Sequence, residues 1–121
     1  MKQGVAMAYD KVLENRILST IDGWKSVSAK KMFGGVCHLL CGNMSCGVYN
    51  NFLILRLGEV SAAEALSNAH TQAFAIKGRP MKGWVMVAPD GFKTEAALTA
   101  WLKKALEFAQ TLPAKEERCG P

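Results

Sequence analysis

The chain has 121 residues, half of them apolar and about a fifth charged, which is typical of one globular domain. No apolar run reaches the ~18 residues that a membrane-spanning helix needs. Residues 1–4 lack the charged-then-apolar pattern of a signal peptide, so we expect a cytoplasmic protein without a membrane partner.

The first predicted element is a helix that follows a flexible leader over residues 1–8. Asp10 can cap this helix, and its apolar residues recur at helical spacing: Leu13, Ile17, Leu18 and Ile21. Asp22-Gly23 is expected to end it.

The centre of the chain predicts a β-meander with two tight turns, at Gly42-Asn43 and at Asn50-Asn51. These turns pair Leu39 with Cys46 and Cys46 with Leu55. One face of the meander is then wholly apolar, and it carries Cys37, Leu39, Cys41, Met44, Cys46, Val48, Leu53, Leu55 and Leu57.

The second half predicts a short helix, two strands and a long helix. Ser61 begins a capping-box pattern, and its helix is expected to reach about Asn68. Strands are predicted over 70–76 and 84–87 on either side of a loop, and Thr94 can cap a final helix that Pro113 ends.

These elements predict an α+β fold. A mainly antiparallel five-stranded sheet with a central meander is packed against the N-terminal and C-terminal helices. The domain is expected over residues 9–112, and residues 113–121 are expected to form a solvated tail.

Histidine and cysteine chemistry is disfavoured by the predicted register. Cys37, Cys41 and Cys46 fall on the face opposite His38, so no Cys–His nucleophile can form. The four cysteines, which include Cys119, are expected to be reduced and lack Cys-x-x-Cys spacing. Ser45 and His38 share a face, but no acid lies on these strands to complete a triad. We therefore predict no catalytic residue, no metal site and no cofactor.

Charge is distributed unevenly along the chain. Residues 23–58 and 65–89 contain no Asp or Glu, and their seven cations exceed the net charge of +5. A basic sheet-and-loop layer of this kind favours an anionic partner, either a protein or a nucleic acid. The predicted binding residues are Lys30, Lys31, Arg56, Lys77, Arg79, Lys82 and Trp84.

The second face of the meander mixes aromatic, aliphatic and polar side chains. An exposed face of this composition suits a protein interface or single-stranded nucleic acid, and its alternative is coverage by the chain's own loops. We predict a homodimer through this face or its edge, with interface residues His38, Tyr49, Phe52 and Ile54.

Four strings of residues resemble the TfoX N-terminal domain family. They are Lys31-Met32-Phe33-Gly34-Gly35, Gly42-Asn43-Met44-Ser45-Cys46-Gly47-Val48, Leu55-Arg56-Leu57-Gly58 and Gly78-Arg79-Pro80-Met81-Lys82-Gly83-Trp84-Val85. They occur in the family's order, and the resemblance covers residues 9–112.

The resemblance implies a link to bacterial DNA uptake. Longer family members act as competence regulators that assist a transcription factor, and they carry a second, C-terminal helical domain. We expect a single-domain member that lacks this second domain.

Two functions follow as alternatives. The first is a non-enzymatic interaction or regulatory module. The second is a binder of a small anionic ligand, or a minor enzyme, with a pocket near residues 78–83. A cleft that holds Arg79, Lys82 and Trp84 would favour the second, and a flat basic surface would favour the first.

Overall fold

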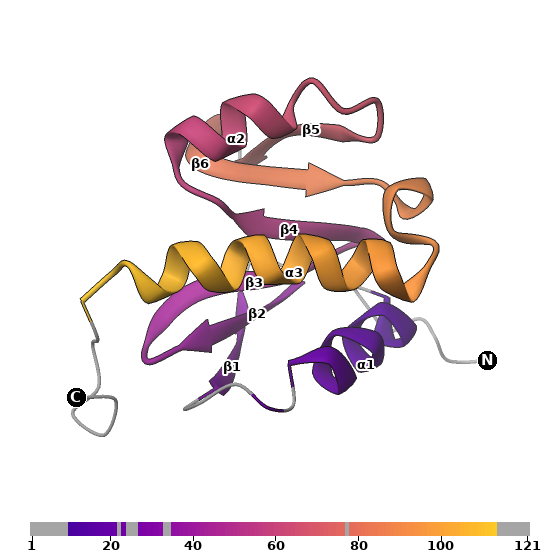
Figure 1. Ribbon diagram of the computed structural model, residues 1–121, viewed down its shortest axis with the longest axis vertical. Helices are drawn as coiled ribbons and strands as arrows, with labels where there is room; N and C mark the ends of the chain where they lie inside the picture. The colour runs from indigo at the N-terminus through magenta and orange to yellow at the C-terminus, as the bar shows by residue number, and fades with distance from the viewer. Residues whose placement is uncertain (1–9, 22, 24–26, 33–34, 77, 114–121) are drawn as a thin grey trace.

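The computed structural model describes residues 10–21, 23, 27–32, 35–76 and 78–113. Six strands form one antiparallel sheet in the order β1-β2-β3-β4-β6-β5 (Figure 1). The strands are β1 (Val27–Met32), β2 (Gly35–Leu40), β3 (Asn43–Tyr49), β4 (Phe52–Arg56), β5 (Thr71–Ile76) and β6 (Arg79–Val87). The predicted α+β class is confirmed.

Helices lie at both ends of the described chain, as predicted. The described helices are α1 (Lys11–Thr20) and α3 (Glu95–Gln110) at the two ends, with α2 (Glu59–Ala65) and the 3-10 helix η2 (Pro89–Phe92) between them. Figure 1 shows α3 running across the sheet with α1 beside it, while α2 lies next to β5 and β6. Among the described residues, no helix is long and apolar enough to cross a bilayer.

The helix caps follow the sequence signals at two of three positions. The Asp10 carboxylate accepts hydrogen bonds from the backbone N–H groups of Val12 and Leu13, at 2.9 and 3.2 Å. The Thr94 hydroxyl accepts one from the N–H of Ala97 at 3.0 Å. The predicted start of α2 at Ser61 is wrong, because the helix begins at Glu59 directly after Gly58, whose φ is +86°.

The main core lies between the sheet and helices α1 and α3. Leu13 and Ile17 of α1 and Leu98 and Leu102 of α3 are at most 2% exposed, and they pack on apolar residues of β2, β3, β4 and β6. Leu18 is 42% exposed, so its predicted place in the helical stripe is wrong.

The sheet has one more strand than predicted. The extra strand is β1, in which the four residues from Ser28 to Lys31 are exposed and show no apolar alternation. β6 also begins at Arg79, within the segment predicted as a loop. β1 is an edge strand in water and needs no buried face. Residues 79–82 of β6 lie beyond the part that pairs with β4 and are mostly exposed, so neither segment carries a hydrophobic signal.

The predicted register of β2 against β3 is wrong. The turn is made by Cys41 and Gly42, with φ of +54° and +85°, instead of Gly42-Asn43. Leu40 then pairs with Asn43, and a β-bulge at Ser45 shifts the register by one residue, so that His38 and not the predicted Leu39 pairs with Cys46. Directly paired residues share a face, so His38 and Cys46 both face the helices.

A second apolar cluster forms on the other face of the sheet. Cys37, Ile54, Phe74 and Trp84 are at most 7% exposed there, and half-buried Leu39, Met44, Tyr49, Met81 and Met86 pack against them. Phe74 of β5 reaches toward Tyr49 of β3, and their ring centroids lie 5.8 Å apart. Neighbouring side chains of the sheet's own strands therefore account for much of the burial on this face. Between β3 and β4, the predicted pairing of Cys46 with Leu55 is confirmed, and Val48 pairs with Leu53.

Candidate functional site

The strands carry positive charge only. Across the described strands there is no Asp or Glu, and the charged side chains are Lys30, Lys31, Arg56, Arg79 and Lys82. The described acids all lie on helices or in the segments that begin them. This confirms the predicted separation of charge between sheet and helices. Lys77 lies outside the described residues.

The cations do not form one continuous layer. Lys30 and Lys31 are exposed on β1, at one edge of the sheet, while Arg79 and Lys82 are exposed on β6. Strands β2, β3 and β4 separate the two pairs, which corresponds to about 19 Å across the sheet. The sheet therefore offers two separate basic positions, each with two cations, to an anionic partner.

Arg56 is turned toward the protein itself. Its guanidinium carbon lies 5.7 Å from the centre of the Phe108 ring of α3, and its Nη1 donates to the carbonyl oxygen of Met44 at 3.5 Å. A cation held over an aromatic face within about 6 Å is stabilised by the ring quadrupole. Arg56 thus links β4 to α3, and its guanidinium is already engaged in contacts within the protein.

Trp84 is also internal. It is 7% exposed, and its ring lies 6.0 Å from that of Phe74 in the second apolar cluster. The binding role predicted for Trp84 stays a prediction, but its indole is not part of a described open cleft with Arg79 and Lys82.

The four predicted interface residues fall into two groups. His38 is 1% exposed and Ile54 is fully buried, so neither belongs to an exposed surface of this chain. Tyr49 and Phe52, which are paired across β3 and β4, are half-buried. The bulge at Ser45 turned His38 to the helix side and away from the other three. An interface role for Tyr49 and Phe52 stays a prediction.

A group of polar side chains lies buried beneath α1. Among the described residues, His38 of β2 has no hydrogen-bond partner at either ring nitrogen, and Glu14 of α1 is 8% exposed. Burial lowers the pKa of His38 below its usual 6.5, and the negative charge of Glu14 opposes this shift. The carboxylate of Glu14 also lies 2.8 Å from Lys11 Nζ. Sequence reasoning missed this group, because it depends on the bulge.

The thiols on these strands are poor nucleophiles. His38 and Cys46 share a face, so the reason given from sequence against a Cys–His pair is wrong. Burial nonetheless raises the pKa of Cys37 to about 11, and burial together with the nearby Cys37 raises the pKa of Cys46 to about 12. A thiol must ionise to attack, so neither cysteine is activated.

Cys41 departs from the expected redox state. It is disulfide-bonded, while Cys37 and Cys46 are free. The prediction that all four cysteines are reduced is therefore wrong for Cys41. In the part of the chain that the structure describes, no group of three or more His, Cys, Asp or Glu side chains is placed to hold a metal ion.

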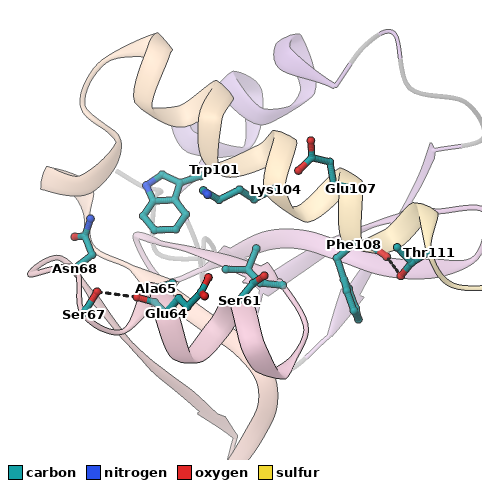
Figure 2. Close-up of a pocket in the computed structure, with 11 residues that line it drawn as sticks. Ser61, Glu64, Ala65, Ser67, Asn68, Trp101, Lys104, Glu107, Phe108 and Thr111 are labelled. Carbon is teal, nitrogen blue, oxygen red and sulfur yellow. Dashed lines mark hydrogen bonds between the residues drawn. The ribbon is translucent and has the colours of Figure 1, made fainter.

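A cleft of about 520 Å³ lies between α2 and α3. Figure 2 shows Trp101 and Lys104 of α3 across from Ser61 and Glu64 of α2, with Phe108 farther along α3. The Trp101 indole N–H donates to the carbonyl oxygen of Gly91 at 3.1 Å, which fixes this wall of the cleft. None of the binding residues predicted from sequence lines it.

A comparison with protein families identifies the family of this chain. The TfoX N-terminal domain matches residues 19–109, which is most of the chain. The chain belongs to the TfoX N-terminal domain family. No curated protein matches the sequence.

The structure explains why two of the TfoX N-terminal strings contain glycine at Gly58 and Gly83. The backbone N–H groups of Leu57 and Gly58 donate to the carbonyl oxygen of Gly83, at 2.8 and 3.2 Å. Gly58 and Gly83 both have positive φ, and an added Cβ on Gly83 would lie 3.3 Å from the backbone of Gly58. The string that ends β4 and the string that begins β6 therefore meet, and their glycines allow the close approach.

Proposed function

We propose that this member of the TfoX N-terminal domain family is a non-enzymatic interaction module that binds an anionic partner through the cations on its strands. The observation that carries the proposal is the charge of the strands, which is positive without a single described exception. Four of these cations, on β1 and β6, are exposed to solvent. An unopposed cationic surface attracts anionic partners and speeds their association.

The described chemistry supports binding over catalysis. The free thiols are buried and hard to ionise, and the buried imidazole of His38 has no cleft beside it among those described. The α2–α3 cleft does not hold Arg79, Lys82 or Trp84. A cleft holding these three residues would have favoured a small-ligand function, so its absence from the described clefts favours the interaction module. We further propose a regulatory role in DNA-uptake competence or transcription, as the family resemblance implies.

Capture of partners from the native cytoplasm, with and without nuclease, tests the proposal. We expect the wild-type chain to capture a partner and a variant with Lys30, Lys31, Arg79 and Lys82 changed to Glu to lose it. A matched control changes two exposed lysines of the helical layer, Lys93 and Lys103, to Glu, and it should retain the partner.

Salt then separates the two classes of partner. Nucleic-acid binding must weaken steeply with added salt, because the cations displace condensed counterions, and nuclease must release it. Binding that survives both the strand charge reversal and added salt would contradict the proposal.

The cleft supports a second candidate function, binding of a small ligand. Along α3, Lys104 and Glu107 lie between the aromatic Trp101 and Phe108, with Glu64 across the cleft on α2 (Figure 2). Neither Lys104 nor Glu64 has an ion pair among the described residues. A small-molecule thermal-shift screen tests this function. A stabilising compound whose effect disappears in Lys104→Ala but persists in Lys103→Ala would support it, and no stabilising compound would count against it.

A further inference from the structure

The two edges of the sheet differ in regularity. β1 pairs with β2 over six consecutive residues without a break, from Val27 opposite Leu40 to Met32 opposite Gly35. β5, at the other edge, has its pairing with β6 interrupted between Ala73 and Ala75. A regular edge strand presents evenly spaced N–H and C=O groups to a further strand, whereas an irregular edge does not. β1 is therefore the edge better shaped to accept another strand.

The outer side of β1 has no strand against it in the described part of the chain. Ser28, Ala29, Lys30 and Lys31 are all exposed, on both faces of the strand. The helices therefore leave the whole middle of this strand open to solvent.

Charge decides which strand fits this edge. Lys30 and Lys31 are consecutive, so their side chains point to opposite faces of the sheet. A second copy paired antiparallel along β1 would place lysines diagonally across from lysines on each face of the sheet, with no acid to offset their repulsion. An incoming strand with two consecutive acidic residues would place one carboxylate opposite each lysine.

We propose that the outer edge of β1 binds an extended acidic segment of a protein partner as a seventh strand, with two consecutive acidic residues opposite Lys30 and Lys31. Backbone hydrogen bonds supply the affinity in this mode of recognition, and side chains on alternate faces supply the specificity. The inference rests on the proposed function and names its partner class as protein.

Two synthetic peptides of identical composition test the inference. Acetyl-Thr-Val-Glu-Glu-Val-Thr-amide carries its acids on both faces, and acetyl-Thr-Glu-Val-Glu-Val-Thr-amide carries both on one face. Each is titrated at low salt into the full ¹⁵N-labelled chain while backbone amide signals are followed. We expect shifts centred on β1 and tighter binding of the first peptide, by about 1.5- to fivefold for the one additional cross-strand ion pair.

Reversing the charge of both the edge and the peptide provides a matched control. Lys30→Glu combined with Lys31→Glu should lose the Glu-Glu peptide and gain acetyl-Thr-Val-Lys-Lys-Val-Thr-amide. Equal binding of the two acidic peptides to the wild type, or retention of the Glu-Glu peptide by this variant, would overturn the inference.

A pair of proline variants separates the backbone edge from the charge. Neighbouring residues of a strand direct their N–H groups to opposite sides, so only one of Ser28→Pro and Ala29→Pro removes a bond to β2. That variant should melt at a lower temperature. The other should keep its melting temperature and lose the Glu-Glu peptide, and unchanged peptide binding in this stable variant would overturn the inference.

The site of the shifts distinguishes failure of this inference from failure of the proposed function. Acidic peptides that shift Arg79 and Lys82 of β6, but not β1, overturn the inference and leave the proposed function standing. A single-stranded oligonucleotide that shifts β1 where neither peptide does would also overturn it, since the partner would then be nucleic acid. If neither peptide nor oligonucleotide shifts any strand residue, both proposals fail.

Discussion

At the scale of single residues, the sheet's cysteines contribute by packing. Cys46 is fully buried in the main core, and Cys37 is fully buried in the second cluster. Because burial raises both pKa values to about 11 and 12, the folded chain at pH 8 should leave both thiols unlabelled by iodoacetamide. Mass spectrometry should show both labelled once urea unfolds the chain. Rapid labelling of either thiol in the folded state would contradict this.

Truncation of Cys46 tests the same packing in energetic terms. Cys46→Ala should lower the free energy of unfolding by roughly 1–2 kcal/mol, because it leaves a small cavity that the close-packed sheet and helices cannot fill. Urea titration measures the loss, and EDTA should leave the melting temperature of the wild type unchanged. A clear drop on adding EDTA would instead show that a metal ion supports the fold.

His38 should make the fold sensitive to acid. Its pKa is lowered in the folded state by burial, so the unfolded chain takes up a proton more readily. Above pH 6.5 both states are neutral and this contribution to stability is complete. As pH falls below 6.5, the free energy of unfolding should decrease by up to about 1.4 kcal/mol per pH unit, through this residue alone.

Urea titrations from pH 7.5 to 4.5 measure this effect. His38→Leu should flatten the decrease, whereas the control His70→Asn, at an exposed position, should leave it unchanged. The same pH slope in wild type and His38→Leu would contradict the role of His38.

At the scale of elements, the junction of β4, α2 and β6 depends on Gly58. An added Cβ there would lie 2.7 Å from Cε1 of Phe108, and the backbone has a φ of +86°. Gly78 has a similar φ of +79°, but no atom of the described residues lies within 4 Å of an added Cβ. Gly78→Ala should cost roughly 1–2 kcal/mol from the backbone alone. Gly58→Ala should cost about 1–3 kcal/mol more through overpacking against α3.

Thermal and urea unfolding of the two glycine variants make the comparison. Because both substitutions require the same unfavourable backbone region, the difference between them isolates the contact with Phe108. Equal losses would show that the ring of Phe108 moves aside freely, and that the junction is not tightly packed.

The elements that the sequence predicts well are those with one buried side. Asp10 and Thr94 cap α1 and α3 as expected, because each precedes an apolar stripe that must meet the sheet. β1 was missed because both of its faces are in water, so its residues do not alternate. The register of β2 was missed for the opposite reason: apolar residues occupy neighbouring positions of β2, such as Val36 and Cys37, and both faces of the strand are largely buried. Its pattern therefore does not mark which face meets the helices.

The candidate site was predictable only in part. The absence of acid from the described strands could be read from residue types alone. The direction of each cation could not, because it depends on neighbours distant in sequence. Arg56 points to Phe108 across 52 positions of chain, and the inward turn of His38 follows from a bulge that no residue type marks.

At the scale of the whole molecule, self-association stays a prediction with a narrower physical basis. The patch expected to drive it has lost Ile54 and His38 to the interior, and half-buried Tyr49 and Phe52 remain at the β3–β4 turn. If a homodimer forms through this face, an ionised carboxylate at position 52 would have to be desolvated in its interface. Phe52→Asp should then yield monomers with only a modest loss of stability. Light scattering across a concentration series measures the oligomeric state. A wild-type chain that stays monomeric at high concentration would contradict the homodimer. Tyr49 and Phe52 would then be available to contact a different protein.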